Sequence, residues 1–231
     1  MTTHTIDVLI PVHNGADYIA AAIDSVRKQT FTDYGIIVID DASTDGSADI
    51  ARSYDDVTVL QPGRVRQSGA LNAGLKFSSA PFVAFLDADD LWTPEKLEIQ
   101  LNYLTDHPKT DGVFGATRQF ISGPDQNASD SMQWQGDSQL GLLLPTLLMR
   151  RDSFDKVGFF NEDHNVNSFL EWYSRAQVCR IVFDPVPETV LYRRVHAQNM
   201  TRVDRTNVVK GYMSALRTRL NQQRTNSDSD G

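Results

Sequence analysis

Short, almost continuous apolar runs alternate with longer amphipathic segments through the first half of the chain. The apolar runs predict buried β-strands, because a strand that is covered on both faces carries apolar residues in succession. The segments between them have helical spacing; in residues 17–29, for example, Ile19, Ala22, Ile23 and Val26 would share one face of a helix. The expected strands are residues 7–12, 36–39, 57–60 and 82–86, and the expected helices are residues 17–29, a segment capped within 43–47 that runs to about 54, residues 67–76 and residues 94–104.

This alternation predicts an α/β fold with a mostly parallel central sheet flanked by helices, in a single domain. The second half of the chain is less regular. There we expect strands at 112–121, 145–149 and 181–183, helices at 168–178 and 208–220, and a polar, mobile loop at 122–139. The domain would cover residues 1–220, followed by a flexible polar tail at 221–231.

Polar residues follow three of the expected strands: His13 and Asn14, Asp40 and Asp41, and Asp87 and Asp89. Ligands of open α/β sheets bind beyond the carboxyl ends of the strands, so these side chains are expected to converge on one site. The stretch F-L-D-A-D-D (85–90) is the densest part of this set, since it adds Asp90. Carboxylates so close together need a compensating cation, and Mg or Mn suits oxygen ligands. The alternative is that these acids are solvated loop and capping residues.

Composition excludes several classes of protein. The chain has 231 residues, 40% of them hydrophobic, and a formal net charge of −8, so binding to nucleic acid is not expected. A single cysteine excludes an internal disulfide and a cysteine-rich zinc site. The longest apolar stretch, residues 140–149, is about half of the ~20 residues that cross a bilayer, and the first residues do not begin a signal peptide. We therefore expect a soluble, cytoplasmic protein. Peripheral contact with a membrane stays open as an alternative.

Other motifs leave alternatives open. The chain has no Walker A sequence and no Gly-x-Gly-x-x-Gly after the first strand, which argues against a P-loop enzyme and a dinucleotide dehydrogenase. Asp87 and Asp89 also fit the Asp-x-Asp of a phosphatase with an aspartyl nucleophile, although that motif usually opens its domain. Glu171 is either a general base or a surface acid paired with Arg175 four residues later, and His196 is either a metal ligand or an ordinary surface histidine.

The ordered set of motifs resembles the family 2 glycosyltransferases, which have the GT-A fold. In the first half the matching segments are VLIPVHNG (8–15), SVRKQT (25–30), IIVIDDASTD (36–45), LNAG (71–74) and FLDADDLWTPEKL (85–97). In the second half they are PTLLMRR (145–151), FDKVGFF (154–160), FLEWYSRA (169–176) and YRRVHAQN (192–199). The resemblance covers about residues 5–200 and implies a nucleotide-binding half at about 5–105 and an acceptor-binding half at about 106–220.

The resemblance also implies a role for each matching residue of the donor site. Pro11, Val12, His13 and Asn14 would form the loop beneath the nucleotide. Asp41 would bind the base, Arg66 would contact the nucleotide, and Asp87 with Ala88 would lie on the ribose side. Asp89 would hold the metal, and His196 would approach the metal and the diphosphate from a C-terminal loop.

Glu171 is the best match for the base that activates the acceptor. The family usually has an acidic pair a few residues before the equivalent of Arg175, whereas this chain has Ser168, Phe169 and Leu170 there, and Asp90 is the substitute.

The implied activity is inverting transfer of a sugar from a nucleotide-diphosphate sugar, with UDP as the expected nucleotide, to an acceptor hydroxyl, assisted by Mn or Mg. A phosphatase and a nucleotide-sugar-binding protein without transfer activity are the competing hypotheses.

Overall fold

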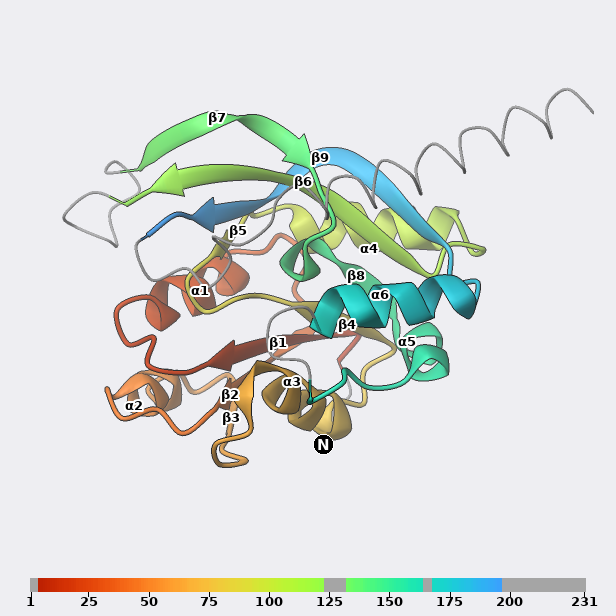
Figure 1. The fold of residues 1–231 in the computed structure, drawn as a ribbon. Helices are drawn as coiled ribbons and strands as arrows, with labels where there is room; N and C mark the ends of the chain where they lie inside the picture. The colour runs from red at the N-terminus through yellow and green to blue at the C-terminus, as the bar shows by residue number, and fades with distance from the viewer. Residues whose placement is uncertain (1–3, 123–131, 164–167, 197–231) are drawn as a thin grey trace, which may run out of the picture. The chain divides into compact units, whose positions relative to one another are not determined.

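The computed structural model describes residues 4–122, 132–163 and 168–196, all of which belong to one compact unit, Met1–Ala197. In this unit a mixed sheet is covered by helices on both faces (Figure 1). None of the helices within the described ranges combines the length and the hydropathy that a bilayer crossing requires. The predicted helix at 208–220 and the predicted tail at 221–231 lie outside the described residues.

The sheet of the described residues has nine strands in the order β3-β2-β1-β4-β8-β6-β9-β5, with β7 paired to β6. The four strands from β3 to β4 are all parallel. Beyond them β8 runs antiparallel to β4 and β6, and β6 is parallel to β9. The strands are β1 (Ile6–Val12), β2 (Tyr34–Asp40), β3 (Val57–Leu60), β4 (Phe82–Phe85), β5 (Leu91–Trp92), β6 (Gly112–Ile121), β7 (Gln133–Leu140), β8 (Leu148–Arg150) and β9 (Phe183–Arg194).

The two faces of β1 explain why its apolar run is continuous. Val8 and Ile10 belong to a core with Ile19 and Ile23 of α1, whereas Leu9 lies on the opposite face, where α3 packs. Gly74 permits this packing, since a Cβ there would lie 2.8 Å from the Ile39 side chain. The helices are α1 (Ile19–Arg27), α2 (Ser47–Arg52), α3 (Arg66–Phe77), α4 (Lys96–Asp106), α5 (Arg151–Val157) and α6 (Ser168–Val178), with a 3₁₀ turn at Leu144–Thr146.

Three predictions for the second half of the chain were wrong. Residues 133–139 of the predicted loop belong to β7, whose side chains are all exposed and so show no alternation of burial. Residues 123–131 of that loop lie outside the described residues. The predicted strand 145–149 is divided between the 3₁₀ turn and β8. In place of the predicted strand 181–183 the structure has the 12-residue β9. Pro185 and Pro187 lie within this strand, and because proline is unusual inside strands the sequence did not predict its full length.

One charged residue lies fully buried in the core between α4 and the sheet. Lys96 has no exposed surface; its Nζ lies 4.4 Å from the centroid of the Trp92 ring and donates a hydrogen bond to Gln100 Oε1. The Gln100 amide in turn donates to the carbonyls of Val113 and Thr146. Burial lowers the pKa of Lys96 well below its usual value.

This burial predicts a pH-dependent stability. The unfolded chain protonates lysine up to about pH 10.4, so between the lowered pKa of folded Lys96 and that value the unfolded state binds more protons. The free energy of unfolding therefore rises with pH in this window, by up to about 1.4 kcal/mol per pH unit. Urea unfolding at several pH values should show this rise in the wild type and lose it in Lys96→Met. The exposed Lys156→Met is the control that keeps it, and a wild-type slope in Lys96→Met would contradict the argument.

Candidate active site

The register of the parallel strands brings three strand ends to one edge of the sheet. Val12 at the end of β1 pairs with Asp40 of β2, and Leu9 pairs with Phe85 at the end of β4. The Asp41 N–H donates to the Val12 carbonyl at 2.8 Å, which continues the contact past the strands. The predicted convergence of the segments that follow these strands is therefore present in the structure.

The segments after β1 and β2 are tied to each other by their polar residues. His13 Nδ1 lies 2.8 Å from the Asp41 carbonyl, and Asn14 Oδ1 accepts the Thr44 N–H at 2.8 Å. Asn14 has φ 51°, in the left-handed region that asparagine tolerates, and its own N–H donates to Ser43 Oγ. His13 and Asn14 therefore shape the loop that follows β1. Pro11, which is half-buried, and Val12, which is buried, are the last two residues of the strand.

Asp41 anchors the segment that leads into α3. Its carboxylate is buried and accepts the N–H groups of Val65 at 2.6 Å and Arg66 at 2.9 Å, as well as the guanidinium of Arg64. These bonds hold Arg66, which has φ 62°, beside the end of β2. The structure thus brings Asp41 and the backbone of Arg66, two predicted site residues, together. Arg64 is a further cation at this place that the sequence analysis missed.

The loop after β4 concentrates three carboxylates. One ligand oxygen from each of Asp87, Asp89 and Asp90 lies within 4.8 Å of the others. The Asp90 N–H donates to the Asp87 carbonyl at 3.1 Å and closes the turn. Asp87 and Asp89 are half-buried, whereas Asp90 is 3% exposed. Ala88, between them, faces the β1 loop near Gly15.

Burial and mutual repulsion disfavour full ionisation of this cluster. Burial, reinforced by the charge of Asp89, raises the pKa of Asp87 to about 7, while Arg193 acts in the opposite direction. Burial and the charges of Asp89 and Asp87 raise the pKa of Asp90 well above its usual value. Three clustered oxygen donors with these properties fit a divalent cation, which would offset the repulsion.

His196 reaches the same loop from the far end of the chain. Its Nε2 lies 2.9 Å from Asp89 Oδ2, and its ring stacks on Tyr18 with 5.0 Å between the centroids. The structure thus brings together the two predicted metal ligands, which are 107 residues apart in sequence.

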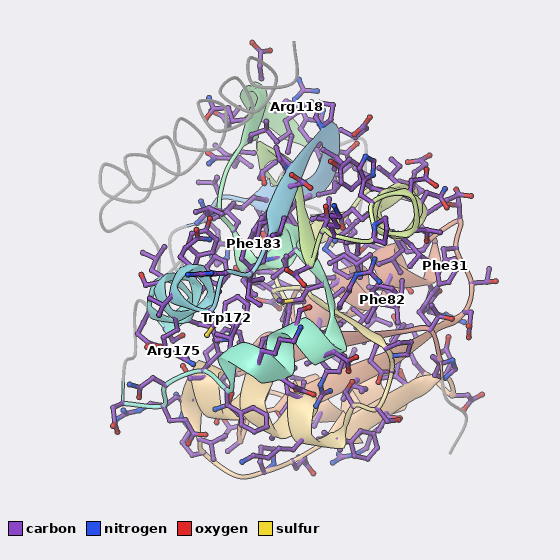
Figure 2. The ribbon with its side chains drawn as sticks, turned by 90° about the vertical axis from the view of Figure 1, so that its right-hand side faces the viewer. Phe31, Phe82, Arg118, Trp172, Arg175 and Phe183 are labelled. Atoms are coloured by element: carbon purple, nitrogen blue, oxygen red, sulfur yellow. The ribbon has the colours of Figure 1, made fainter. Side chains whose placement is uncertain are left out.

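Glu171 lies in a different environment. Both of its carboxylate oxygens accept from Arg175, at 2.7 and 3.1 Å, as the surface-acid alternative predicted. Arg175 also donates to the carbonyls of Val157 and Phe159, and Trp172 donates to the Gly158 carbonyl. Trp172 and Arg175 both lie on the side of α6 that meets α5 (Figure 2). Glu171 therefore takes part in joining these two helices.

Comparisons with known proteins identify the family of this chain. Residues 7–169 match the model of a family described as Glycosyl transferase family 2. An uncharacterised glycosyltransferase of Rickettsia prowazekii is 32% identical over 213 residues, which covers 85% of this chain and 65% of the relative. UDP-Glc:alpha-D-GlcNAc-diphosphoundecaprenol beta-1,3-glucosyltransferase WfgD of Escherichia coli is 34% identical over 107 residues, covering 45% of this chain and 42% of the relative.

Solved structures show the same fold. S. aureus TarS in complex with UDP-GlcNAc aligns with a TM-score of 0.71 at 19% identity, over 87% of this chain and 61% of that one. Mannosyltransferase PcManGT of Pyrobaculum calidifontis, in complex with GDP-Man and Mn2+, aligns with a TM-score of 0.64 at 21% identity, over 86% of this chain and 59% of that one. The chain thus spans less than two thirds of the length of these relatives. From the family match over most of its length, the chain belongs to glycosyltransferase family 2.

Proposed function

We propose that the protein transfers a sugar from a nucleotide-diphosphate sugar to an acceptor hydroxyl, with inversion at the anomeric carbon and with the help of Mn or Mg. The observation that carries this proposal is the cluster of Asp87, Asp89 and Asp90 with His196 at the carboxyl edge of a parallel sheet. The UDP and UDP-GlcNAc complexes of TarS support a UDP-sugar as donor, and the Mn2+ of PcManGT supports the metal. The phosphatase alternative gains no support from these relatives.

We propose a separate role for each group of residues around the cluster. Asp89 and His196 would hold the cation, which when bound neutralises the diphosphate leaving group. Asp87 and Ala88 would lie on the ribose side, where Gln67 Nε2 is 3.4 Å from Asp87 Oδ1. Pro11, Val12, His13 and Asn14 would line the nucleotide, with Asp41 and Arg66 beside the base. We also propose that the domain extends to residue 220 and that the protein is cytoplasmic.

The base that takes the proton from the acceptor is assigned by elimination between two carboxylates. Glu171 already gives both oxygens to Arg175. Asp90 follows the metal-binding Asp89 directly in sequence, and only its Oδ1 accepts the Arg194 N–H. We therefore place the base at Asp90 in preference to Glu171.

Asp89→Asn should abolish metal-dependent transfer and leave the fold intact. We expect Mn2+ affinity and turnover with UDP-sugars to fall at least ~100-fold, because an ionised ligand is lost. The melting temperature of the metal-free protein should hold or rise, because one repelling charge has been removed. Isothermal titration with Mn2+, a transfer assay and thermal melts measure these quantities, with the exposed Asp106→Asn as the control. Full transfer by Asp89→Asn in the presence of EDTA would exclude the metal role.

Asp90→Asn and Glu171→Gln separate the two candidate bases. Loss of a general base lowers kcat by ~10²–10⁴ without changing donor affinity, and we expect this result for Asp90→Asn. Glu171→Gln should instead lower the melting temperature, because it breaks the link to Arg175, and should change kcat by less than ~10-fold. Steady-state kinetics, donor titration and thermal melts make the comparison. The reverse pattern would move the base to Glu171, and donor binding by the wild type without transfer to any acceptor would favour a binding protein.

A further inference from the structure

A buried arginine lies where four segments of the site meet. Arg194, the last residue of β9, is 1% exposed. Its guanidinium carbon lies 5.2 Å from the ring centroid of Tyr18, which precedes α1, and 4.9 Å from that of Phe120 in β6. Contacts of the planar guanidinium with two aromatic rings restrict its orientation and therefore the direction of its N–H groups.

Two bonds of Arg194 act on the acidic loop. Its Nε donates to the carbonyl of Asp89 at 2.8 Å, and its backbone N–H donates to the carboxylate of Asp90 at 2.8 Å. Its Nη1 donates to Ser122 Oγ, just past the end of β6. One residue therefore fixes the main chain of Asp89 and the side chain of Asp90 at the same time.

The same residue sets the position of His196. The two residues are separated by Val195, whose N–H donates to the Phe120 carbonyl at 2.8 Å. His196 stacks on the Tyr18 ring that Arg194 also contacts. The distance of 2.9 Å between His196 Nε2 and Asp89 Oδ2 thus depends on the placement of Arg194.

Charge gives Arg194 a second effect on the loop. Carboxylates held this close repel one another, and a cation within the same buried region offsets part of that repulsion. Burial lowers the pKa of Arg194, whereas Tyr18 and the charges of Asp90 and Asp89 act in the opposite direction. A lysine would keep the charge but would lack the planar fork that serves Asp89 and Ser122 together.

We propose that Arg194 is a positioning residue that preorganises Asp89 and His196 for a divalent cation and holds Asp90 beside them. The inference rests on the proposed function, since it takes Asp89 and His196 as the metal ligands. Residues that orient metal ligands typically change metal affinity or activity by 10–100-fold when they are replaced.

Arg194→Lys tests this role with Mn2+ as the probe. Arg150 provides a matched control, since its guanidinium likewise donates two hydrogen bonds, to the carbonyls of Leu104 and Thr110, and lies 5.5 Å from the centroid of the Phe82 ring. Arg150 is in β8 and pairs with the first residue of β4, away from the carboxyl edge. Mn2+ affinity is measured by electron paramagnetic resonance, and stability by thermal melts without metal.

We expect Arg194→Lys to weaken Mn2+ binding by about 10–100-fold and Arg150→Lys to leave it unchanged, although both lower the melting temperature. Equal Mn2+ affinity in Arg194→Lys and the wild type would reduce Arg194 to a packing residue and overturn the proposal. The milder Ser122→Ala, which removes one acceptor of the guanidinium, should weaken binding in the same direction if Arg194→Lys does not fold. A wild type that binds no Mn2+ yet transfers sugar would overturn the metal role itself, whereas one that binds Mn2+ without transferring would leave the positioning role standing.

Discussion

The repulsion among the carboxylates of Asp87, Asp89 and Asp90 is the constraint on which the arrangement of this site depends. Their ligand oxygens lie within 4.8 Å of one another at the end of a buried strand, where water screens charge poorly. The chain offsets part of this repulsion with Arg193 and with the N–H and guanidinium groups of Arg194. The pKa of Asp87 nevertheless stays raised to about 7, so the protein alone does not fully stabilise the ionised cluster. A divalent cation, as proposed for this site, would offset the repulsion that remains.

The acids at this edge fall into two groups according to their donors. Asp40, fully buried, accepts from the Ser43 N–H and from Gln61, and Asp41 accepts two backbone N–H groups and Arg64. Donors of this kind stabilise a carboxylate within the fold, so these two acids fix the loops that follow β2 and β3. The carboxylates of the β4 loop are crowded together instead, and their charge is stabilised only in part. Asp40 and Asp41 therefore stabilise the loops of the site, whereas the acids of the β4 loop are the ones that we propose bind a ligand.

The sequence predicted the parallel half of the fold and the three converging strand ends, because both follow from local apolar runs and the polar residues after them. It could not predict Arg194, because the effect of this residue comes from contacts with Tyr18, Phe120 and Asp89, which are distant in sequence. Strand β7 was not predicted, because every side chain of this edge strand is exposed and the strand therefore shows no alternation of buried and exposed residues. For Glu171 the spacing to Arg175 favoured an ion pair, and the family resemblance favoured a base; the structure shows the ion pair.

The register of β9 decides whether the two halves of the sheet form one site. Phe120 of β6 pairs with Arg194, and successive side chains of a strand point to opposite faces. A slip by one residue would put Arg193 or Val195 against Phe120, and both the bond to the Asp89 carbonyl and the contact of His196 with Asp89 would be lost. The β6–β9 ladder contains register shifts between Phe114 and Thr117, upstream of these residues. These irregularities set which face of β9 carries Arg194, so the geometry of the acidic loop depends on bulges in the middle of the ladder.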